Sequence, residues 1–349
     1  MNIAVFLPNI KPVCGRTNMG ISLVKGLNRK GVSVSLITNP ESDLTLLPKL
    51  EIKRLIIPCN PENKSLLSFL KSITALNKFI KENKIEIVNT HHRYCEFISI
   101  STRYIFDLDY KISTTVHSFT NNLKAISYRA DRLIAVSSFI KNHLIKKYGK
   151  KDLFIDVIYN GVEEELDHYP DQKNDEKYIL GFGRLDYEKG FDILIKALIF
   201  LTDKVALPKL ILVGEGNEEN KLRLLAEEHN INVEFVKSNS TPWETIKNSL
   251  FVVVPSREEP LGLVILEAGL IGKAIIASNV GGIPEVIDDD KSGLLFENGN
   301  YFQLAELLNK LIINKTLAEQ LGLELKQKVE RQFSYDQMIQ NYISVFNDL

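Results

Sequence analysis

Residues 255–268 read PSREEPLGLVILEA and follow the apolar run Phe251 to Val254. This order predicts a buried strand, a turn and the start of a helix. Gly262 has no Cβ at a point where a ligand can approach. The N–H groups of Leu263 and Val264 lie in the first helical turn, where no carbonyl of the helix accepts from them. Such a helix start favours a diphosphate through its free amides and its dipole.

Two glutamates flank this turn. Glu259 precedes the predicted helix, and Glu267 lies about two turns along from it. Carboxylates placed in this way can accept hydrogen bonds from hydroxyl groups at opposite ends of a ligand such as a nucleotide sugar. Taken alone, the pattern fits an ordinary strand–helix turn with surface glutamates equally well, so both interpretations stay open at this point.

A second segment, GFGRLDYEKG at residues 181–190, follows a predicted strand. The segment after a parallel strand is where open α/β sheets bind ligands. Arg184 supplies a planar guanidinium and Lys189 a compact positive charge, and the two together can neutralise a leaving diphosphate. A lone Gly-x-Gly pattern is weak evidence for a ligand site. The position of this segment directly after a strand makes it a candidate for binding a ligand.

Short apolar runs alternate with helical patterns along the whole chain, which predicts parallel sheets built from βαβ units. At 349 residues, two domains are expected. We place them at 1–165 and 166–334, joined by the acidic, apolar-poor segment 163–177, with a final helix over 335–349 that returns to the first domain. Strands are expected at 3–7, 32–38, 85–89, 112–116, 133–136, 155–158, 178–182, 210–213, 233–235, 251–254 and 274–277. The first helix is expected after a loop over 8–18.

Composition narrows the class of protein. The net charge of −1 provides no global positive field for nucleic acid, so we expect no nucleic-acid partner. Cys14, Cys59 and Cys95 are isolated, which predicts neither a metal centre nor a disulfide framework. No apolar run approaches the length that spans a bilayer, and no signal peptide is recognised at the N-terminus. We therefore expect a cytoplasmic protein, peripheral at most at the inner face of a membrane.

The segment between Lys64 and Lys84 has the pattern of an amphipathic helix. Its expected buried face comprises Leu66, Phe69, Leu70, Ile73, Leu76 and Ile80. Lys64, Lys71 and Lys78 line the other face. A solvated face is the first interpretation of these lysines. The alternative is an electrostatic dock for anionic lipid, aided by Leu67, which lies outside the apolar pattern.

Taken in chain order, these segments resemble glycosyltransferase family 4, the retaining enzymes with the GT-B fold. The resemblance covers nearly the whole chain. Glu259 and Glu267 match the two ends of the family's Glu-x-seven-Glu motif. The segments that carry the resemblance are ADRLIAVSSFIKNHLIKKYG (130–149), VIYNGV (157–162), GFGRLDYEKGFDILIKAL (181–198), LILVGEG (210–216), PSREEPLGLVILEAGLIGKAIIASNVGGIPEVI (255–287) and SGLLF (292–296).

The resemblance implies two Rossmann-like, doubly wound parallel-sheet domains that face a cleft, with the nucleotide sugar in the second domain and the acceptor on the side of the first. It implies a UDP- or GDP-linked donor, a saccharide or lipid-linked acceptor, and no cofactor or metal. The second domain would bind the donor through Arg184 and Lys189 at the diphosphate, Leu263 and Val264 through their amides, Glu267 at the ribose, Glu259 and Gly262 at the sugar, and Val236 to Ser238 at the base.

In the first domain, the resemblance places Gly15 near the diphosphate and His117 beside the donor sugar. The chain departs from the family pattern here. Cys14-Gly15 stands for the usual Gly-Gly, Thr17 for a frequent acidic residue, and Asn89-Thr90-His91 for His-x-His. Because side chains alternate along a strand, at most one of the adjacent His91 and His92 is expected to enter the site.

Other functions remain open at this point. A GT-B nucleotide-sugar epimerase would convert the donor without an acceptor, and a non-catalytic relative would only bind a nucleotide sugar. A phosphorylase-like enzyme would need phosphate or a pyridoxal lysine, for which we find no candidate. Asp107-Leu108-Asp109 matches the Asp-x-Asp pattern that binds a metal in another glycosyltransferase fold, but this short pattern often occurs by chance.

Overall fold

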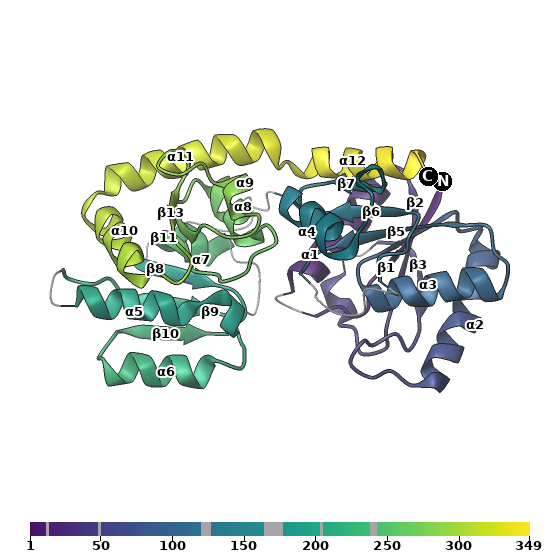
Figure 1. Cartoon of the computed structure of the whole chain (residues 1–349), viewed down its shortest axis with the longest axis horizontal. Coiled ribbons are helices and arrows are strands. Elements are labelled where there is room, and N and C mark those ends of the chain that lie inside the picture. The colour runs from purple at the N-terminus through teal and green to yellow at the C-terminus, as the bar shows by residue number, and fades with distance from the viewer. Residues whose placement is uncertain (12–13, 48–49, 120–126, 164–176, 203–204, 238–242) are drawn as a thin grey trace. The chain divides into compact units, whose positions relative to one another are not determined.

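The computed structural model describes residues 1–11, 14–47, 50–119, 127–163, 177–202, 205–237 and 243–349, and these form two compact units (Figure 1). Unit 1 comprises Met1–Asn160 and Tyr335–Leu349, and unit 2 comprises Gly161–Ser334. Each unit is built around one parallel sheet with helices packed on it. The prediction of two α/β domains with parallel sheets is therefore confirmed. The expected linker over 163–177 lies almost entirely outside the described residues.

Unit 1 contains a seven-stranded sheet in the order β3-β2-β1-β4-β5-β6-β7, with every neighbouring pair parallel. The predicted strands of this half are present, and β3 is an addition. The side chains of β3 are mostly exposed because it lies at the sheet edge, so it lacks the continuous apolar run of a central strand. The strands are β1 (Asn2–Phe6), β2 (Ser33–Thr38), β3 (Lys53–Ile56), β4 (Ile87–Thr90), β5 (Lys111–Val116), β6 (Arg132–Ala135) and β7 (Ile155–Val157).

The helices of unit 1 pack on this sheet around two clusters of buried apolar side chains. Phe6, Leu76 and Ile98 lie in the first cluster, and Leu133 and Ile140 in the second. The helices are α1 (Gly15–Arg29), α2 (Leu66–Asn83), α3 (Arg93–Ile105), α4 (Ser138–Tyr148) and α12 (Tyr335–Asn347).

Helix α1 begins at Gly15, within the stretch where we expected a loop. The early start follows from burial, because Thr17 and Met19 in its first turns are buried against the unit. The helix ends as predicted near Gly31. This glycine follows the C-cap residue Lys30 and has a φ of 77°. This left-handed conformation is the one that glycine adopts without strain at a helix end.

Helix α12, the last of the chain, packs against α1 within unit 1 (Figure 1). Gly26 of α1 lets it approach closely, since a Cβ there would lie 2.3 Å from the Cδ1 atom of Ile339. The Tyr335 hydroxyl donates to the Ser22 carbonyl at 2.7 Å. The end of the chain is thus held in the first unit by both apolar packing and a hydrogen bond.

Helix α2 differs from its predicted face. Leu66 and Leu70 were expected to be buried, yet they are 75% and 48% exposed. Phe79, which was not predicted, is buried instead, together with the predicted Ile73, Leu76 and Ile80. The apolar period predicts which side faces the core, but it cannot show that the first turns lack a packing partner.

Unit 2 contains a six-stranded sheet in the order β10-β9-β8-β11-β12-β13, again with every pair parallel. The three-residue strand β13 was not predicted. It is too short to show a period. The strands are β8 (Tyr178–Phe182), β9 (Leu210–Val213), β10 (Val233–Val236), β11 (Ser249–Val254), β12 (Ile275–Ser278) and β13 (Leu294–Phe296).

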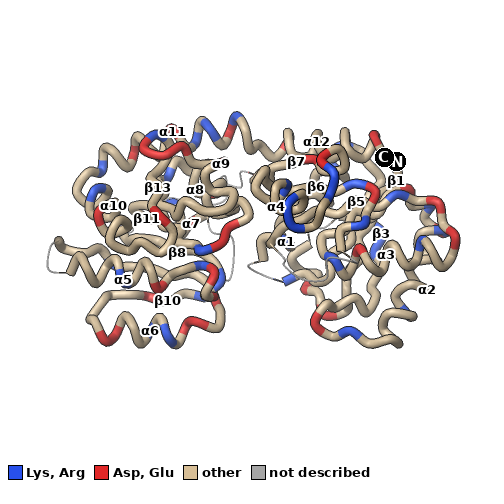
Figure 2. The backbone as a smooth tube through the Cα atoms, in the orientation of Figure 1, with Lys and Arg blue, Asp and Glu red and all other residues tan. Residues whose placement is uncertain are grey.

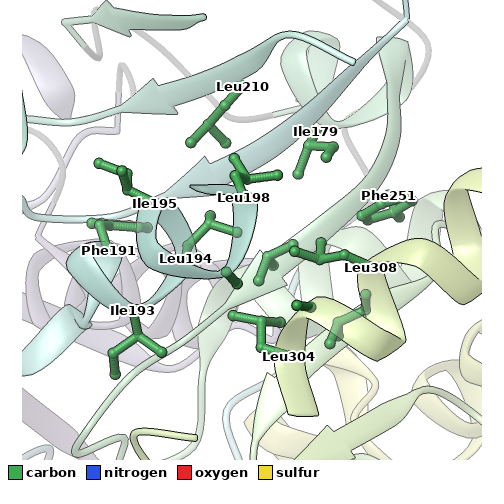
Figure 3. Close-up of a cluster of buried hydrophobic side chains, with 14 of the residues drawn as sticks. Ile179, Phe191, Ile193, Leu194, Ile195, Leu198, Leu210, Phe251, Leu304 and Leu308 are labelled. Carbon is green, nitrogen blue, oxygen red and sulfur yellow. The ribbon is translucent and has the colours of Figure 1, made fainter. Parts of the chain in front are cut away.

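A large apolar cluster between the unit 2 sheet and its helices fixes this unit (Figure 3). Ile179 and Phe251 of the central strands meet Leu194, Leu198 and other side chains of α5, and α10 adds Leu304 and Leu308. The helices are α5 (Phe191–Leu201), α6 (Glu219–Glu228), α7 (Trp243–Asn248), α8 (Leu263–Ile271), α9 (Ile283–Val286), α10 (Tyr301–Ile313) and α11 (Lys315–Gln332).

No helix in the described part of either unit is both long enough and apolar enough to cross a bilayer.

Candidate active site

The strand order of unit 2 reverses between β8 and β11, the two central strands of its sheet. In open α/β sheets, ligands bind outside the carboxyl ends of the strands at such a reversal. The segment after β8 carries Arg184 and Lys189, and the segment after β11 carries Glu259 and Gly262. The topology therefore brings the two candidate segments of the sequence to one point of the sheet.

The two segments are joined by an ion pair. Lys189 Nζ donates to Glu259 Oε2 at 2.6 Å, and the Ser256 hydroxyl lies 3.3 Å from the same oxygen. Glu259 is only 6% exposed, so its charge depends on Lys189 for compensation. Gly190 makes the close approach of the segments possible. It has φ of 67°, and a Cβ there would lie 2.1 Å from the Pro255 carbonyl oxygen.

Arg184 presents its guanidinium at the surface of the same segment, with a side chain that is 59% exposed. It pairs with Asp186, whose other carboxylate oxygen lies 3.4 Å from the Asn217 amide. Arg184 and Lys189 thus both belong to the segment after β8, and each has an acidic partner in the structure.

Helix α8 begins directly after this ion pair. Its N-cap residue Gly262 has φ of 94°, a conformation that side chains with a Cβ rarely adopt. The amides of Leu263 and Val264 lie in the first turn and have no helical acceptor. The segment therefore presents free N–H groups beside the positive charge of Lys189, which is a suitable setting for a phosphate.

Glu267 lies on α8 one turn after Leu263, and it is half-buried. Among the described residues we find no side chain within hydrogen-bonding or ion-pair distance of its carboxylate. Burial raises its pKa to about 7. A carboxylate that is desolvated and without a partner is ready to accept hydrogen bonds from a ligand.

One contact that the sequence did not indicate braces the two segments. Arg257 donates from Nη1 and Nη2 to the two carboxylate oxygens of Asp192, both at 2.8 Å, and from Nη1 to the Tyr187 carbonyl. Although burial works against ionisation of Asp192, hydrogen bonding from Arg257 leaves its pKa below the ordinary value. Asp192 and Arg257 are 65 residues apart, and no motif spacing points to their pairing.

Val236, the predicted base contact, is the last residue of β10 and is half-buried. The segment that continues from it, beginning at Ser238, lies outside the described residues. Val236 therefore lies at the carboxyl end of the edge strand β10, which is separated from the central strand β8 by β9.

Unit 1 has a second reversal of strand order, between β1 and β4. Gly15 begins α1 after β1 and is exposed. Arg16 beside it was not predicted. Its Nη2 lies 3.4 Å from Asn9 Oδ1, and its Nε is buried with no hydrogen-bond partner among the described residues. A guanidinium with a buried free donor next to a helix start can bind an anion. In the sequence, the one signal for this role of Arg16 is its position directly after Gly15.

His117 directly follows β5 at the same edge of the sheet and is half-buried. Its Nε2 lies 2.8 Å from Nδ1 of His91, and the two rings are inclined by 21°. His91 is 3% exposed, and its Nε2 lies 2.8 Å from Asn89 Oδ1. His92 instead caps α3, where its Nδ1 accepts from the Tyr94 amide. The structure thus brings one of the two adjacent histidines to His117 and gives the other a capping contact.

Both paired rings are held neutral. Burial lowers the pKa of His91 to about 3, and the Arg16 charge adds to this. The pKa of His117 is lowered well below its ordinary value by burial first, and then by His91 and Arg16. At neutral pH each ring therefore has one protonated and one unprotonated nitrogen.

Asp107 and Asp109 follow the end of α3, and both are exposed. Nowhere in the described ranges do three or more His, Cys, Asp or Glu side chains gather in a group that could hold a metal ion. The Asp-x-Asp pattern thus has no third ligand among these residues.

Two family models match adjacent parts of the chain. "Glycosyltransferase Family 4" matches residues 18–166, and "Glycosyl transferases group 1" matches residues 163–328. Together the two models cover residues 18–328, so the chain belongs to the family 4 type of glycosyltransferases, and its two α/β domains with parallel sheets have the architecture of the GT-B class.

Curated relatives agree with this assignment. An uncharacterized glycosyltransferase of Methanocaldococcus jannaschii, MJ1178, is 31% identical over 229 residues, which are 65% of this chain and 62% of that protein. The capsular polysaccharide biosynthesis glycosyltransferase CapM of Staphylococcus aureus is 26% identical, with 94% of each chain covered. The chain is thus a glycosyltransferase of GT-B type with a relative in capsular polysaccharide synthesis.

Solved structures show the same fold. Anabaena HepE, determined in complex with UDP-glucose, superposes with a TM-score of 0.86 at 20% identity, covering all of both chains. A sucrose-phosphate synthase from Thermosynechococcus elongatus superposes with a TM-score of 0.84 at 19% identity, covering 99% of this chain and 98% of that one. The prediction of the GT-B fold is therefore confirmed.

Proposed function

We propose that this glycosyltransferase moves a hexose from a UDP- or GDP-linked donor to a hydroxyl of a saccharide or lipid-linked acceptor, with retention of configuration and without a metal, in the synthesis of cell-surface polysaccharide or glycolipid. The observation that carries the proposal is the edge of the unit 2 sheet. Lys189, the amides at the start of α8, and the carboxylates of Glu259 and Glu267 gather there. This is the set of charges that a nucleotide sugar requires.

The donor would use these groups in order along its length. Its diphosphate would lie at the start of α8, where free amides and the Lys189 ammonium offset its charge. Glu267 would accept from the ribose hydroxyls, and Val236 would lie toward the base. HepE, which has this fold, was solved with UDP and with UDP-glucose, and this supports a nucleotide-diphosphate sugar as the donor.

Departure of the nucleotide diphosphate concentrates negative charge on its terminal phosphate. Arg184, Lys189 and the α8 amides would stabilise that charge, which is the task a divalent ion performs in other transferases. Retention would follow if the acceptor hydroxyl attacks on the leaving-group face while a donor phosphate oxygen takes its proton. The protein's own contribution is then binding, orientation and charge stabilisation.

A panel of UDP-, GDP- and ADP-sugars tests this function, with the melting temperature measured in EDTA. The matching donor should raise the melting temperature by mass action, and its turnover in the presence of candidate saccharide acceptors should survive the chelator. Turnover that is lost in EDTA and restored by Mn²⁺ or Mg²⁺ would argue against metal-free chemistry. Conversion of the donor to another nucleotide sugar without an acceptor would favour the epimerase alternative.

The pH dependence of donor affinity tests the role of Glu267. Its pKa is about 7 in the free protein, and hydrogen bonds from ribose hydroxyls would lower this value because they favour the ionised form. Affinity for the nucleotide sugar should therefore be full above pH 7 and fall by up to about tenfold per pH unit below it. Calorimetry between pH 5.5 and 8.5 measures this. In Glu267→Gln the slope should disappear, and a slope that persists would assign the proton to another group.

We also propose that the first turns of α2 contact anionic lipid. Leu66, Leu67 and Leu70 are 75%, 63% and 48% exposed, and the lysines at 64 and 71 are exposed beside them. Exposed leucines next to lysines are the combination that docks on an acidic bilayer surface. Figure 2 shows positive and negative residues interspersed over unit 1, so the proposed lipid contact rests on the leucines and lysines at the start of α2 and not on an overall positive charge of the unit.

Co-sedimentation with vesicles that contain phosphatidylserine tests this contact. Changing Lys64, Lys71 and Lys78 to glutamate should reduce binding, and so should raised salt, because exposed charges are screened beyond roughly 8–10 Å at physiological ionic strength. A matched control changes the exposed Lys146 and Lys147 of α4 to glutamate and should bind as before. Equal sedimentation of both variants and the wild type would leave the lysine face merely solvated.

A further inference from the structure

A chain of hydrogen bonds leads from the interior of unit 1 to His117. Asn89 Nδ2 donates to Ser113 Oγ at 2.8 Å and to Thr115 Oγ1 at 3.3 Å. Its Oδ1 lies 2.8 Å from His91 Nε2, and His91 Nδ1 lies 2.8 Å from His117 Nε2. Every member lies on β4, on β5 or within one residue of their carboxyl ends. The mechanism proposed above uses no member of this chain, and the family resemblance assigns a role only to the last one, His117.

The orientation of Asn89 sets the direction of the chain. Asn89 is fully buried, and in the orientation observed both amide hydrogens meet hydroxyl oxygens while Oδ1 faces an imidazole nitrogen. The reversed amide would leave one buried N–H without an acceptor among the described residues, which is the costlier arrangement. Thr115 Oγ1 also lies 3.1 Å from the Tyr342 hydroxyl of α12, so its own hydrogen has a partner while its oxygen accepts from Asn89.

The proton positions of both histidines follow from that orientation. Because Asn89 Oδ1 can only accept, His91 must bear its proton on Nε2. His91 is neutral, so its Nδ1 is a lone pair, and His117 must donate to it from Nε2. A neutral His117 then has its lone pair on Nδ1, the nitrogen that has no hydrogen-bond partner among the described residues.

We infer that Asn89 and His91 are positioning residues that hold His117 in its Nε2–H form, so that the ring accepts through Nδ1 a hydrogen bond from a hydroxyl of the bound sugar. The role toward sugar rests on the proposed function, whereas the tautomer does not. A histidine fixed in this way selects a hydroxyl donor and rejects a bare oxygen acceptor at the same point, because two lone pairs would face each other.

Nuclear magnetic resonance on protein labelled with ¹⁵N-histidine tests the tautomer directly, without any substrate. The chain has six histidines, and the spectra of His117→Ala and His91→Gln assign the two of interest. In the wild type at pH 7.5, long-range ¹H–¹⁵N correlations should show both rings protonated on Nε2. A wild-type His117 protonated on Nδ1, or a doubly protonated His91, would overturn the inference even if Asn89→Asp does not fold.

The variant Asn89→Asp tests the positioning role. A carboxylate in place of the amide favours a second proton on His91, which would then donate from Nδ1 and switch His117 to its Nδ1–H form. We expect that switch in the spectrum and a fall in kcat of tenfold or more, with the affinity for UDP or GDP changed by less than twofold. A switched tautomer with unchanged kcat would overturn the positioning role and leave the proposed function standing.

Thr90→Val is the matched control. It removes the buried Thr90 hydroxyl and so breaks its 2.8 Å hydrogen bond with the Thr114 hydroxyl, which joins the same two strands outside the chain of hydrogen bonds. Its tautomers and kcat should match the wild type even if its melting temperature falls. A control that loses as much kcat as Asn89→Asp would mark the effect as general softening of the sheet and would overturn the inference.

Discussion

Replacing Lys189 with methionine is expected to lower donor turnover by roughly 10²-fold or more. The substitution removes the ammonium that pairs with Glu259, three residues before the N-cap of α8, while it keeps the approximate length of the side chain. A charge-assisted contact of this kind strengthens as the diphosphate leaves, so kcat should fall more than the affinity for the donor. Steady-state turnover of the donor that the nucleotide-sugar panel identifies provides the measurement.

The same variant should also lose stability, and this effect has to be separated from catalysis. Glu259 is 6% exposed and would be left as a buried carboxylate without its partner, which typically costs about 3–5 kcal/mol. The double variant Lys189→Met/Glu259→Gln removes both charges. Its melting temperature should return toward that of the wild type while its turnover stays low. Recovery of turnover together with stability would show that Lys189 acts through folding alone.

Arg184→Ala offers a second test of the diphosphate site. Its guanidinium is 59% exposed, so the melting temperature should hardly move while turnover falls by on the order of 10²-fold. Lys221→Ala is the matched control, because it breaks a comparable exposed ion pair on α6. If Arg184→Ala and Lys189→Met both turn over the donor at the wild-type rate, the diphosphate lies elsewhere.

The sheets could be predicted because parallel strands buried on both faces appear in the sequence as short, continuous apolar runs. The run at Phe251 to Val254 and that at residues 178–182 are of this kind, and both are central strands. The two strands that were not predicted, β3 and β13, lie at sheet edges and lack this signal, although the edge strands β7 and β10 were predicted. Burial of β3 is slight and β13 has three residues, so neither had a period to detect. The exposure of the first turns of α2 was missed for a related reason. The apolar periodicity of a helix does not show how far along the helix the structure that packs against it extends.

The candidate donor segments were also predictable, since each follows a strand and carries the residue types that a diphosphate requires. Their pairing was not. Lys189 and Glu259 are 70 residues apart, and Arg257 and Asp192 are 65 apart, and the strand order alone makes them neighbours. In unit 1, the sequence singled out His117. The partner that sets its proton, His91, depends on how the ends of β4 and β5 are aligned across the sheet.

His117→Ala is expected to lower sugar transfer by roughly 10²-fold while the affinity for the free nucleotide diphosphate stays within about twofold. The reason is that the candidate diphosphate groups Arg184 and Lys189 lie in unit 2, whereas His117 lies in unit 1. Burial lowers its pKa well below the ordinary value, so the ring cannot offer a positive charge to the departing phosphate at neutral pH, and its loss should affect the sugar. Calorimetry with UDP or GDP and a transfer assay on the same preparation measure both quantities, with His143→Ala on α4 as the control for loss of a histidine from this unit.

Full transfer activity would remove His117 from the site. Lost nucleotide binding together with a lowered melting temperature would show that the ring supports the fold, because its removal leaves His91 Nδ1 buried without a donor.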